Sequence, residues 1–259
     1  MQNYHPDTIN LDDYFLLDKD TPVNEIDFVR GQTILIDKPL DWTSFDVVNK
    51  IRGKIRYQLG FKKIKVGHAG TLDPLATGLL IICTGKLTKS IDLLQAIEKR
   101  YSGTITLGAT TATYDAEVEP ENIRPTDHLT EKDLQDATTG FRGKIEQIPP
   151  IYSAIKIEGH AAYNLARRGK DPIMKARSVE ITRFDLTKIQ SPHVEFDVIC
   201  SKGTYIRSLA NDFGQVLGVG GYLSGLRREA IGQFSVQKAF TIEEIINLIE
   251  SITPIVHPK

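Results

Sequence analysis

The chain has 259 residues, of which 41% are hydrophobic and 25% are charged, and its 32 Lys and Arg nearly balance its 33 Asp and Glu. This composition is typical of a folded globular protein and excludes a largely disordered or fibrous one. The near-neutral charge also argues against a protein that binds its partner by bulk positive charge, although a local basic surface remains open.

The N-terminal part of the chain changes character near residue 30. Residues 1–30 carry seven acidic side chains and two prolines, and we expect an acidic extension with little regular structure. The apolar run at 33–37 then predicts a short strand. This strand should end at Lys38-Pro39, because proline cannot donate a hydrogen bond to a strand ladder.

An amphipathic helix with a basic face follows. Thr43 and Asp46 have the spacing of a capping box, and apolar residues then recur every three or four positions as far as Leu59. No acidic residue lies between Asp46 and Asp73, whereas seven basic residues do: Lys50, Arg52, Lys54, Arg56, Lys62, Lys63 and Lys65. Such a tract is usually a solvated helix face, and contact with phosphate groups is the alternative.

The rest of the chain mixes strands and helices without a regular βαβ alternation. We expect strands at 78–84, 101–108, 143–147, 177–189 and 194–201, and helices at 87–98, 130–138, 161–168, 206–216 and 241–252. The pattern favours an α+β fold around a mixed or antiparallel sheet. It also suggests three parts: the extension at 1–30, a main domain at 31–240, and a short C-terminal helix and tail at 241–259.

Signals for export, membranes and metals are weak. The acidic N-terminus lacks the basic and apolar segments of a signal peptide, and no apolar run approaches the ~20 residues of a membrane span. Cys83 and Cys200 lie too far apart for a disulfide framework or a CxxC site, and the six histidines show no zinc spacing. These features predict a cytoplasmic protein without a metal site.

The densest chemical signal is the segment Gly67-His68-Ala-Gly-Thr-Leu-Asp73-Pro-Leu-Ala-Thr-Gly78. Its glycines permit close backbone approach, and the proline biases Asp73 away from helical conformations, so a carboxylate is displayed on an irregular loop. Catalytic groups are often held on such loops, although an isolated Asp-Pro is more often an ordinary turn.

This segment resembles the active-site motif of the TruB-type tRNA pseudouridine-55 synthases, in which the aspartate is catalytic. Further blocks resemble the family in the same order: Lys38-Pro39 with Trp42-Thr43-Ser44, Lys99-Arg100-Tyr101, Pro149-Pro150-Ile-Tyr-Ser-Ala-Ile-Lys156, Cys200-Ser-Lys-Gly-Thr-Tyr205-Ile-Arg207 and Gly225-Leu226-Arg227-Arg228. Several motifs in one order, over residues 31–236, are far more specific than one. The resemblance implies a pseudouridine synthase fold, with a mainly antiparallel sheet flanked by helices and loops around a catalytic cleft.

The resemblance also implies a reaction. The enzyme would flip a uridine out of the T-stem and loop of tRNA, break its glycosidic bond and rejoin the base through C5. This chemistry needs an ionised carboxylate and no cofactor. Asp73 could attack the ribose or the base, or remove a ribose proton, and the sequence leaves these three routes open.

Roles for other residues follow from the same resemblance. Arg207 is the expected partner of Asp73, because a nearby guanidinium favours a carboxylate over the acid. Tyr101 is the expected stacking surface for the flipped base. The further candidates for substrate binding are Lys38, His68, Lys89, Tyr205 and Leu226. The implied partner is tRNA alone, bound by a monomer with neither metal nor membrane.

Two other functions stay open. One is an inactive RNA-binding module, although Asp73, Tyr101 and Arg207 together argue against it. The other is a glycosidase, which would pair Asp73 with a second carboxylate that none of these motifs supplies. Family members often carry a C-terminal PUA domain, and the short stretch after Val236 predicts that it is absent.

Overall fold

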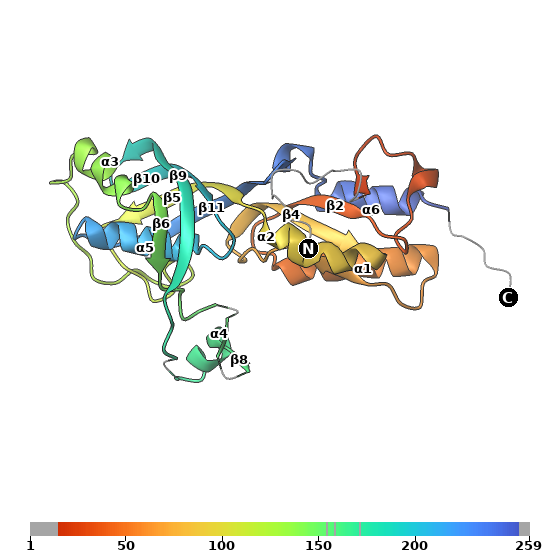
Figure 1. The fold of residues 1–259 in the computed structure, drawn as a ribbon, viewed down its shortest axis with the longest axis horizontal. Coiled ribbons are helices and arrows are strands. Elements are labelled where there is room, and N and C mark those ends of the chain that lie inside the picture. Colours follow the sequence, from red (N-terminus) through yellow and green to blue (C-terminus); the bar gives the residue numbers. More distant parts are fainter. Residues whose placement is uncertain (1–14, 154, 158, 171, 254–259) are drawn as a thin grey trace, which may run out of the picture. The chain divides into compact units, whose positions relative to one another are not determined.

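The computed structural model describes residues 15–153, 155–157, 159–170 and 172–253. The chain divides into two compact units (Figure 1). Unit 1 is built from residues up to Lys99 and from Arg227 onwards, and unit 2 from Arg100–Leu226. The expected parts at 1–30, 31–240 and 241–259 stay a prediction. Among the described residues, no helix has the length and apolar character that crossing a membrane requires.

Unit 1 is a small sheet with helices and short 3-10 turns. Its strands are β1 (Leu16–Leu17), β2 (Thr33–Lys38), β3 (Val66–His68), β4 (Ala76–Thr84), β12 (Phe234–Ser235) and the C-terminal part of β11 (Gly221–Ile231). Its helices are α1 (Ser44–Leu59), α2 (Ile91–Ala96) and α6 (Ile242–Ser251), and its 3-10 turns are Val23–Glu25, Gly85–Ser90 and Val236–Lys238. The strand order is β1-β2-β4-β11, and β3 also pairs with β4.

The sheet of unit 1 is buried on both faces, because successive residues of a strand point to opposite sides. One face packs alternate residues of β2 and β4 against α1 and α6: Ile34, Ile36, Leu80 and Ile82. The other face packs the intervening residues against α2 and the segment around β12: Leu35, Leu79, Ile81 and Cys83. Burial on both sides explains why β4 has a nearly continuous apolar sequence.

The start of α1 confirms the predicted capping box. The hydroxyl of Thr43 accepts a hydrogen bond from the Asp46 N–H at 3.0 Å, and the Asp46 carboxylate accepts one from the Thr43 N–H at 2.9 Å. The helix ends at Gly60, whose φ of 71° is the left-handed conformation that glycine adopts readily.

The described part of the N-terminal segment is more ordered than the sequence led us to expect. Strand β1 pairs in parallel with the edge of β2, and Leu17 and Phe28 are buried in the same core as α1 and α6. Lys19 forms an ion pair with Glu244 of α6 at 2.6 Å. From residue 15 onwards, this segment is therefore part of the packing of unit 1; residues 1–14 lie outside the described residues.

The strands of unit 2 are mainly antiparallel. Its strands are β5 (Lys99–Leu107, its first residue in unit 1), β6 (Gly143–Gln147), β7 (Lys156–Ile157), β8 (His160–Ala161), β9 (Arg177–Gln190), β10 (His193–Cys200) and the N-terminal part of β11. Its helices are α3 (Glu131–Thr139), α4 (Ala162–Ala166) and α5 (Ile206–Val216). The order is β11-β5-β10-β9-β6, and β7 and β8 form a separate pair. The two units confirm the predicted α+β class.

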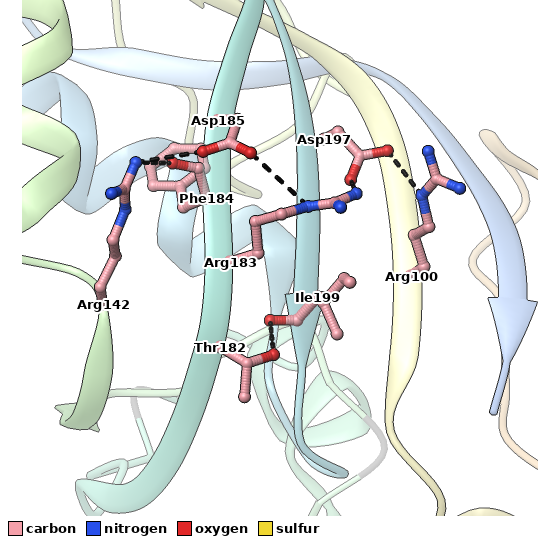
Figure 2. A network of polar contacts seen from close by, with 8 residues as sticks. All are labelled: Arg100, Arg142, Thr182, Arg183, Phe184, Asp185, Asp197 and Ile199. Atoms are coloured by element: carbon pink, nitrogen blue, oxygen red, sulfur yellow. Dashed lines mark hydrogen bonds and ion pairs between the residues drawn. The ribbon is translucent and has the colours of Figure 1, made fainter.

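The two faces of the sheet in unit 2 differ in chemistry. One face buries a cluster of phenylalanines in edge-to-face contact, with ring centroids 5.6–6.2 Å apart: Phe141, Phe184, Phe196 and Phe213. The other carries a row of alternating charges (Figure 2): Arg100, Asp197, Arg183, Asp185 and Arg142. In this row each carboxylate bridges two guanidinium groups along a partly exposed surface, so the three arginines and two aspartates leave one net positive charge.

Candidate active site

Asp73 lies in unit 1 on the irregular loop between β3 and β4. Its carbonyl oxygen accepts a hydrogen bond from the Ala76 N–H at 3.0 Å, which closes a turn through Pro74. The Asp73 side chain is partly exposed. The loop therefore presents a carboxylate at a sharp turn, as the glycine and proline spacing predicts.

The side chains of Ser44 and Arg228, one before and one far after the loop in sequence, hold it in place. The Ser44 hydroxyl, in the first turn of α1, accepts a hydrogen bond from the Leu72 N–H at 2.8 Å and donates one to the Leu72 carbonyl at 3.1 Å. Arg228 of β11, whose side chain is fully buried, donates to the carbonyls of Gly70 at 3.0 Å and Leu79 at 2.7 Å. A longer contact of 3.5 Å joins it to Thr71. Hydrogen bonds from the Ser44 and Arg228 side chains to the main chain thus fix the loop on both sides of the Asp73 turn.

The position of Arg228 depends on a glycine. Gly78 has a φ of 100°, and a Cβ at this position would lie 2.4 Å from the Arg228 carbonyl oxygen. No L-amino acid with a side chain fits there without moving the backbone. Gly78 therefore permits the close approach of β4 and β11 that brings the Arg228 guanidinium to the loop.

Lys38 completes the support of the loop. Its buried ammonium donates hydrogen bonds to the carbonyls of Trp42 at 2.6 Å, Pro39 at 2.8 Å and Pro74 at 3.4 Å. Burial lowers the pKa of Lys38 from 10.5 to about 8, and the Asp73 carboxylate acts in the opposite direction. The same attraction favours the ionised form of Asp73. These contacts give Lys38 a role in shaping the loop, and its predicted contact with substrate stays a prediction.

His68 and Lys89 occupy different environments within unit 1. His68 lies on β3 opposite Ile82 of β4. Burial and the positive charge of Arg228 lower the pKa of His68 below its usual 6.5, so the imidazole is neutral near pH 7. Lys89 is exposed in the 3-10 turn Gly85–Ser90. The expected contacts of His68 and Lys89 with RNA stay predictions.

The lowered pKa of His68 predicts a pH dependence of stability. The unfolded chain binds a proton near pH 6.5, whereas the folded protein binds it only at lower pH, so His68 destabilises the fold as pH falls through this range. The parent should lose more unfolding free energy between about pH 7.5 and about pH 5.5 than His68→Gln does. Urea denaturation of both proteins at the two pH values measures this difference. Identical pH dependences would show that His68 titrates alike in both states.

Arg207 lies in unit 2, buried in the first turn of α5. Its Nη1 is 3.4 Å from Oδ2 of Asp115 and donates to the Thr113 carbonyl at 3.2 Å, and its Nη2 donates to the Tyr152 carbonyl at 3.0 Å. Asp115 in turn accepts hydrogen bonds from the Thr113 hydroxyl at 2.5 Å and the Glu117 N–H at 3.0 Å. The guanidinium is therefore held in one orientation by buried polar groups.

Asp115 is a site residue that the sequence analysis missed. It belongs to no recognised motif, and the one cue is the alternation Thr111, Thr113, Asp115. The Thr113 hydroxyl donates to the Asp115 carboxylate, and the Thr111 hydroxyl donates to the Asp115 main-chain carbonyl. A carboxylate buried beside an arginine is expensive to leave unpaired. Asp115 therefore orients the Arg207 side chain in addition to stabilising the local turn.

The remaining candidates also lie in unit 2. Tyr101 is buried in β5, at 8% exposure. Tyr205 precedes α5, and its main-chain N–H and carbonyl both bond to the Gln147 side chain, at 2.8 and 3.1 Å. The Arg177 guanidinium lies 4.6 Å from the Tyr205 ring centroid. Leu226 is partly exposed in β11.

The structure thus assembles the candidates in two groups. Lys38 and Asp73 come together in unit 1, where His68 is also found, and Arg207 joins Asp115 in unit 2. The expected pairing of Asp73 with Arg207 links residues of different units, and it stays a prediction. Across the part of the chain that the structure describes, no group of three or more His, Cys, Asp or Glu is placed to hold a metal ion.

The basic tract divides into paired and exposed residues. Lys54 forms an ion pair with Glu250 of α6, and Arg52 donates to the Asn49 side chain. The other five side chains of the tract are exposed: Lys50, Arg56, Lys62, Lys63 and Lys65. The part of the tract that is open to a partner is therefore smaller than the sequence indicates.

Comparison with known proteins identifies relatives along most of the chain. A family model described as "TruB family pseudouridylate synthase (N terminal domain)" matches residues 56–206, and one described as "tRNA pseudouridylate synthase B C-terminal domain" matches residues 207–254. The tRNA pseudouridine synthase B of Phocaeicola vulgatus is 49% identical over 218 residues, which cover 84% of this chain and 93% of that protein. That of Flavobacterium johnsoniae is 49% identical over 217 residues, with coverages of 83% and 95%.

Solved structures show the same fold. A chain of the crystal structure of a Cbf5-Nop10-Gar1 complex has a TM-score of 0.65 and 27% identity over 88% of this chain. A chain in the structure of an H/ACA RNP bound to a substrate RNA containing 2'-deoxyuridine has a TM-score of 0.61 and 25% identity, again over 88% of this chain. This chain spans 57% and 56% of the length of those two chains.

Proposed function

Because this chain belongs to the TruB family of pseudouridylate synthases, we propose that it converts uridine 55 in the T-loop of tRNA to pseudouridine. The observation that carries the proposal is the Asp73 loop, which presents a carboxylate on a turn fixed by Lys38, Ser44 and Arg228. The substrate element is the T-stem and loop. We further propose that the protein acts in the cytoplasm as a monomer and without a metal.

The reaction is an isomerisation, so nothing is oxidised or reduced. The bond from N1 of uracil to C1′ of the ribose breaks, a bond from C5 to C1′ forms, and the proton on C5 is released while N1 gains one. An ionised Asp73 could begin this exchange by attacking C1′ or the base, or by removing a ribose proton. All three routes need the carboxylate in its charged form, which the neighbouring Lys38 ammonium favours.

The other candidates take roles around the flipped nucleotide. A uridine stacked in folded RNA is out of reach of a carboxylate, so the base must leave the stack and be stabilised outside it. We assign Tyr101 as the stacking surface, and Tyr205 and Leu226 as further walls for the base. Arg207, oriented by Asp115, is assigned as the partner of Asp73. His68 and Lys89 are assigned to contacts with the RNA.

Release of tritium from tRNA labelled at C5 of uridine tests this function against its alternatives. A pseudouridine synthase releases one tritium for each modified uridine and leaves pseudouridine in the intact RNA. A glycosidase would liberate uracil and leave an abasic site, and an inactive RNA-binding module would release nothing. We expect release to rise to one tritium per tRNA when only the T-loop position is labelled.

A further inference from the structure

The exposed face of α1 contains a glycine that the packing of unit 1 does not explain. Gly53 lies in the middle of this helix, where glycine is less favourable than alanine. Its backbone has no positive φ, and a Cβ built on it would meet no atom outside its own helix within 4 Å among the described residues. Neither backbone conformation nor close contact within the described part of the chain therefore requires a glycine there.

The residues around Gly53 have the chemistry of a nucleic-acid surface. Positions three and four residues away are its neighbours on the helix, and these are Asn49, Lys50, Arg56 and Tyr57. Lys50 and Arg56 are exposed, and Tyr57 is 84% exposed, an unusual position for so large an aromatic side chain. We call these five residues the Gly53 surface. It combines two cations, an amide and an aromatic ring around a position without a side chain.

The nearby charges favour an anionic partner. The segment after α1 adds the exposed Lys62, Lys63 and Lys65. The carboxylate of Asp46 is occupied in the capping box at the helix start. Glu250 of α6 pairs with Lys54, on the edge of α1 where Gln58 also bonds to the α6 backbone. Among the described residues, the exposed charges on the Gly53 surface and in the segment directly after α1 are therefore basic.

We propose that the Gly53 surface binds the sugar-phosphate backbone of the substrate RNA, with Tyr57 stacked on a base or ribose. This inference rests on the proposed function. The missing side chain at Gly53 lets the backbone approach the helix closely, Lys50 and Arg56 lie on either side of it for phosphate contacts, and an exposed aromatic ring stacks on any base.

The position of α1 gives this surface a role in binding and not in chemistry. Ser44, at the helix start, contacts Leu72 of the Asp73 loop. At ~1.5 Å per residue, Lys50 lies roughly 9 Å and Tyr57 roughly 20 Å further along the helix axis. The RNA that reaches the Gly53 surface is therefore well away from the nucleotide at Asp73. Loss of the Gly53 surface should raise the dissociation constant for RNA and leave the rate at saturating RNA unchanged.

The test measures affinity for a fluorescent T-arm hairpin and the single-turnover rate at saturating RNA. Tyr57→Ala should weaken binding about 5-fold or more, the lower end of what base stacking contributes. Gly53→Gln should also weaken binding by obstructing the surface, although it replaces glycine with a better helix former and should raise the melting temperature. A folding defect would lower both the affinity and the melting temperature, so this variant separates lost RNA contact from lost stability.

Two lysines on the same helix provide a matched pair. Lys50→Gln should weaken binding and reduce the slope of log affinity against log salt by about 0.7–0.9, the loss of one phosphate contact. Lys54→Gln removes the same charge from the residue paired with Glu250 and should leave the slope unchanged.

Val216→Ala is the control for Tyr57→Ala, because it also removes exposed apolar area, in this case from α5.

The outcomes separate this inference from the function on which it rests. If the parent binds and modifies the hairpin while Tyr57→Ala, Gly53→Gln and Lys50→Gln all keep the parent's affinity, the Gly53 surface is a solvated helix face and the inference is wrong. If the parent neither binds nor modifies the hairpin, the proposed function fails and the inference fails with it.

Discussion

Asp73→Asn should lower the single-turnover rate of uridine conversion by about 10²- to 10⁴-fold. Asparagine keeps the shape of the side chain but has neither the charge nor the basicity that all three chemical routes require. Ser44 and Arg228 hold this loop through hydrogen bonds to main-chain groups of Gly70 and Leu72, which the substitution leaves in place, so the loop should keep its conformation. Affinity for the T-arm hairpin should stay within about 3-fold of the parent's, which corresponds to less than about 1 kcal/mol.

Asp92→Asn is the matched control, because Asp92 is an exposed residue of α2 in the same unit. It should keep the parent's rate and affinity. Single-turnover conversion and equilibrium binding of the same hairpin give both quantities for each protein. An Asp73→Asn protein that retains more than about a tenth of the parent's rate would show that this carboxylate is not the catalytic group.

Arg228→Met should reduce both stability and rate. It leaves the carbonyls of Gly70 and Leu79 without the donor that now satisfies them, and a buried unpaired polar group costs about 1–3 kcal/mol. We therefore expect the unfolding free energy to fall by about 2–6 kcal/mol. Because both carbonyls flank the Asp73 turn, the rate at saturating RNA should fall as well. Urea denaturation and single-turnover kinetics measure the two effects.

The neighbouring arginine separates loop positioning from general stability. Arg227 forms a two-point ion pair with Asp37, at 2.7 and 3.0 Å, on a partly exposed surface. Arg227→Met should cost about 1 kcal/mol or less, as exposed ion pairs usually do, and should have a smaller effect on the rate. If folded Arg228→Met converts uridine at the parent's rate, Arg228 stabilises unit 1 without positioning Asp73.

Elements with a strong apolar period could be predicted from the sequence. The helix predicted at 206–216 coincides with α5, and the strand predicted at 78–84 lies within the apolar strand β4. β11 was missed, because Gly221–Ile231 mixes glycine, serine and charged residues and buries an arginine that composition assigns to the surface. The helix predicted at 87–98 is shorter, because residues 85–90 form a 3-10 turn before α2.

The display of the Asp73 carboxylate on a turn could be predicted from the sequence, whereas the groups that hold the turn could not. The glycines and Pro74 around Asp73 are local signals for a displayed carboxylate, and the structure has this turn. The hydrogen bonds of Arg228 to the loop join residues about 150 positions apart, which no local pattern encodes. Asp115 was missed for the same reason, because its value lies in its contact with Arg207 and not in its neighbours along the chain.

We expect isomerisation of one uridine of the tRNA T-loop to depend on Asp73. The most direct measurement uses a T-arm hairpin with tritium at C5 of that uridine alone, and a second hairpin with tritium at C5 of all the remaining uridines. We expect release of one tritium per molecule from the first hairpin and none from the second, with pseudouridine in the intact product and no release by Asp73→Asn. Release from the second hairpin, free uracil, or no release from the first would contradict this expectation.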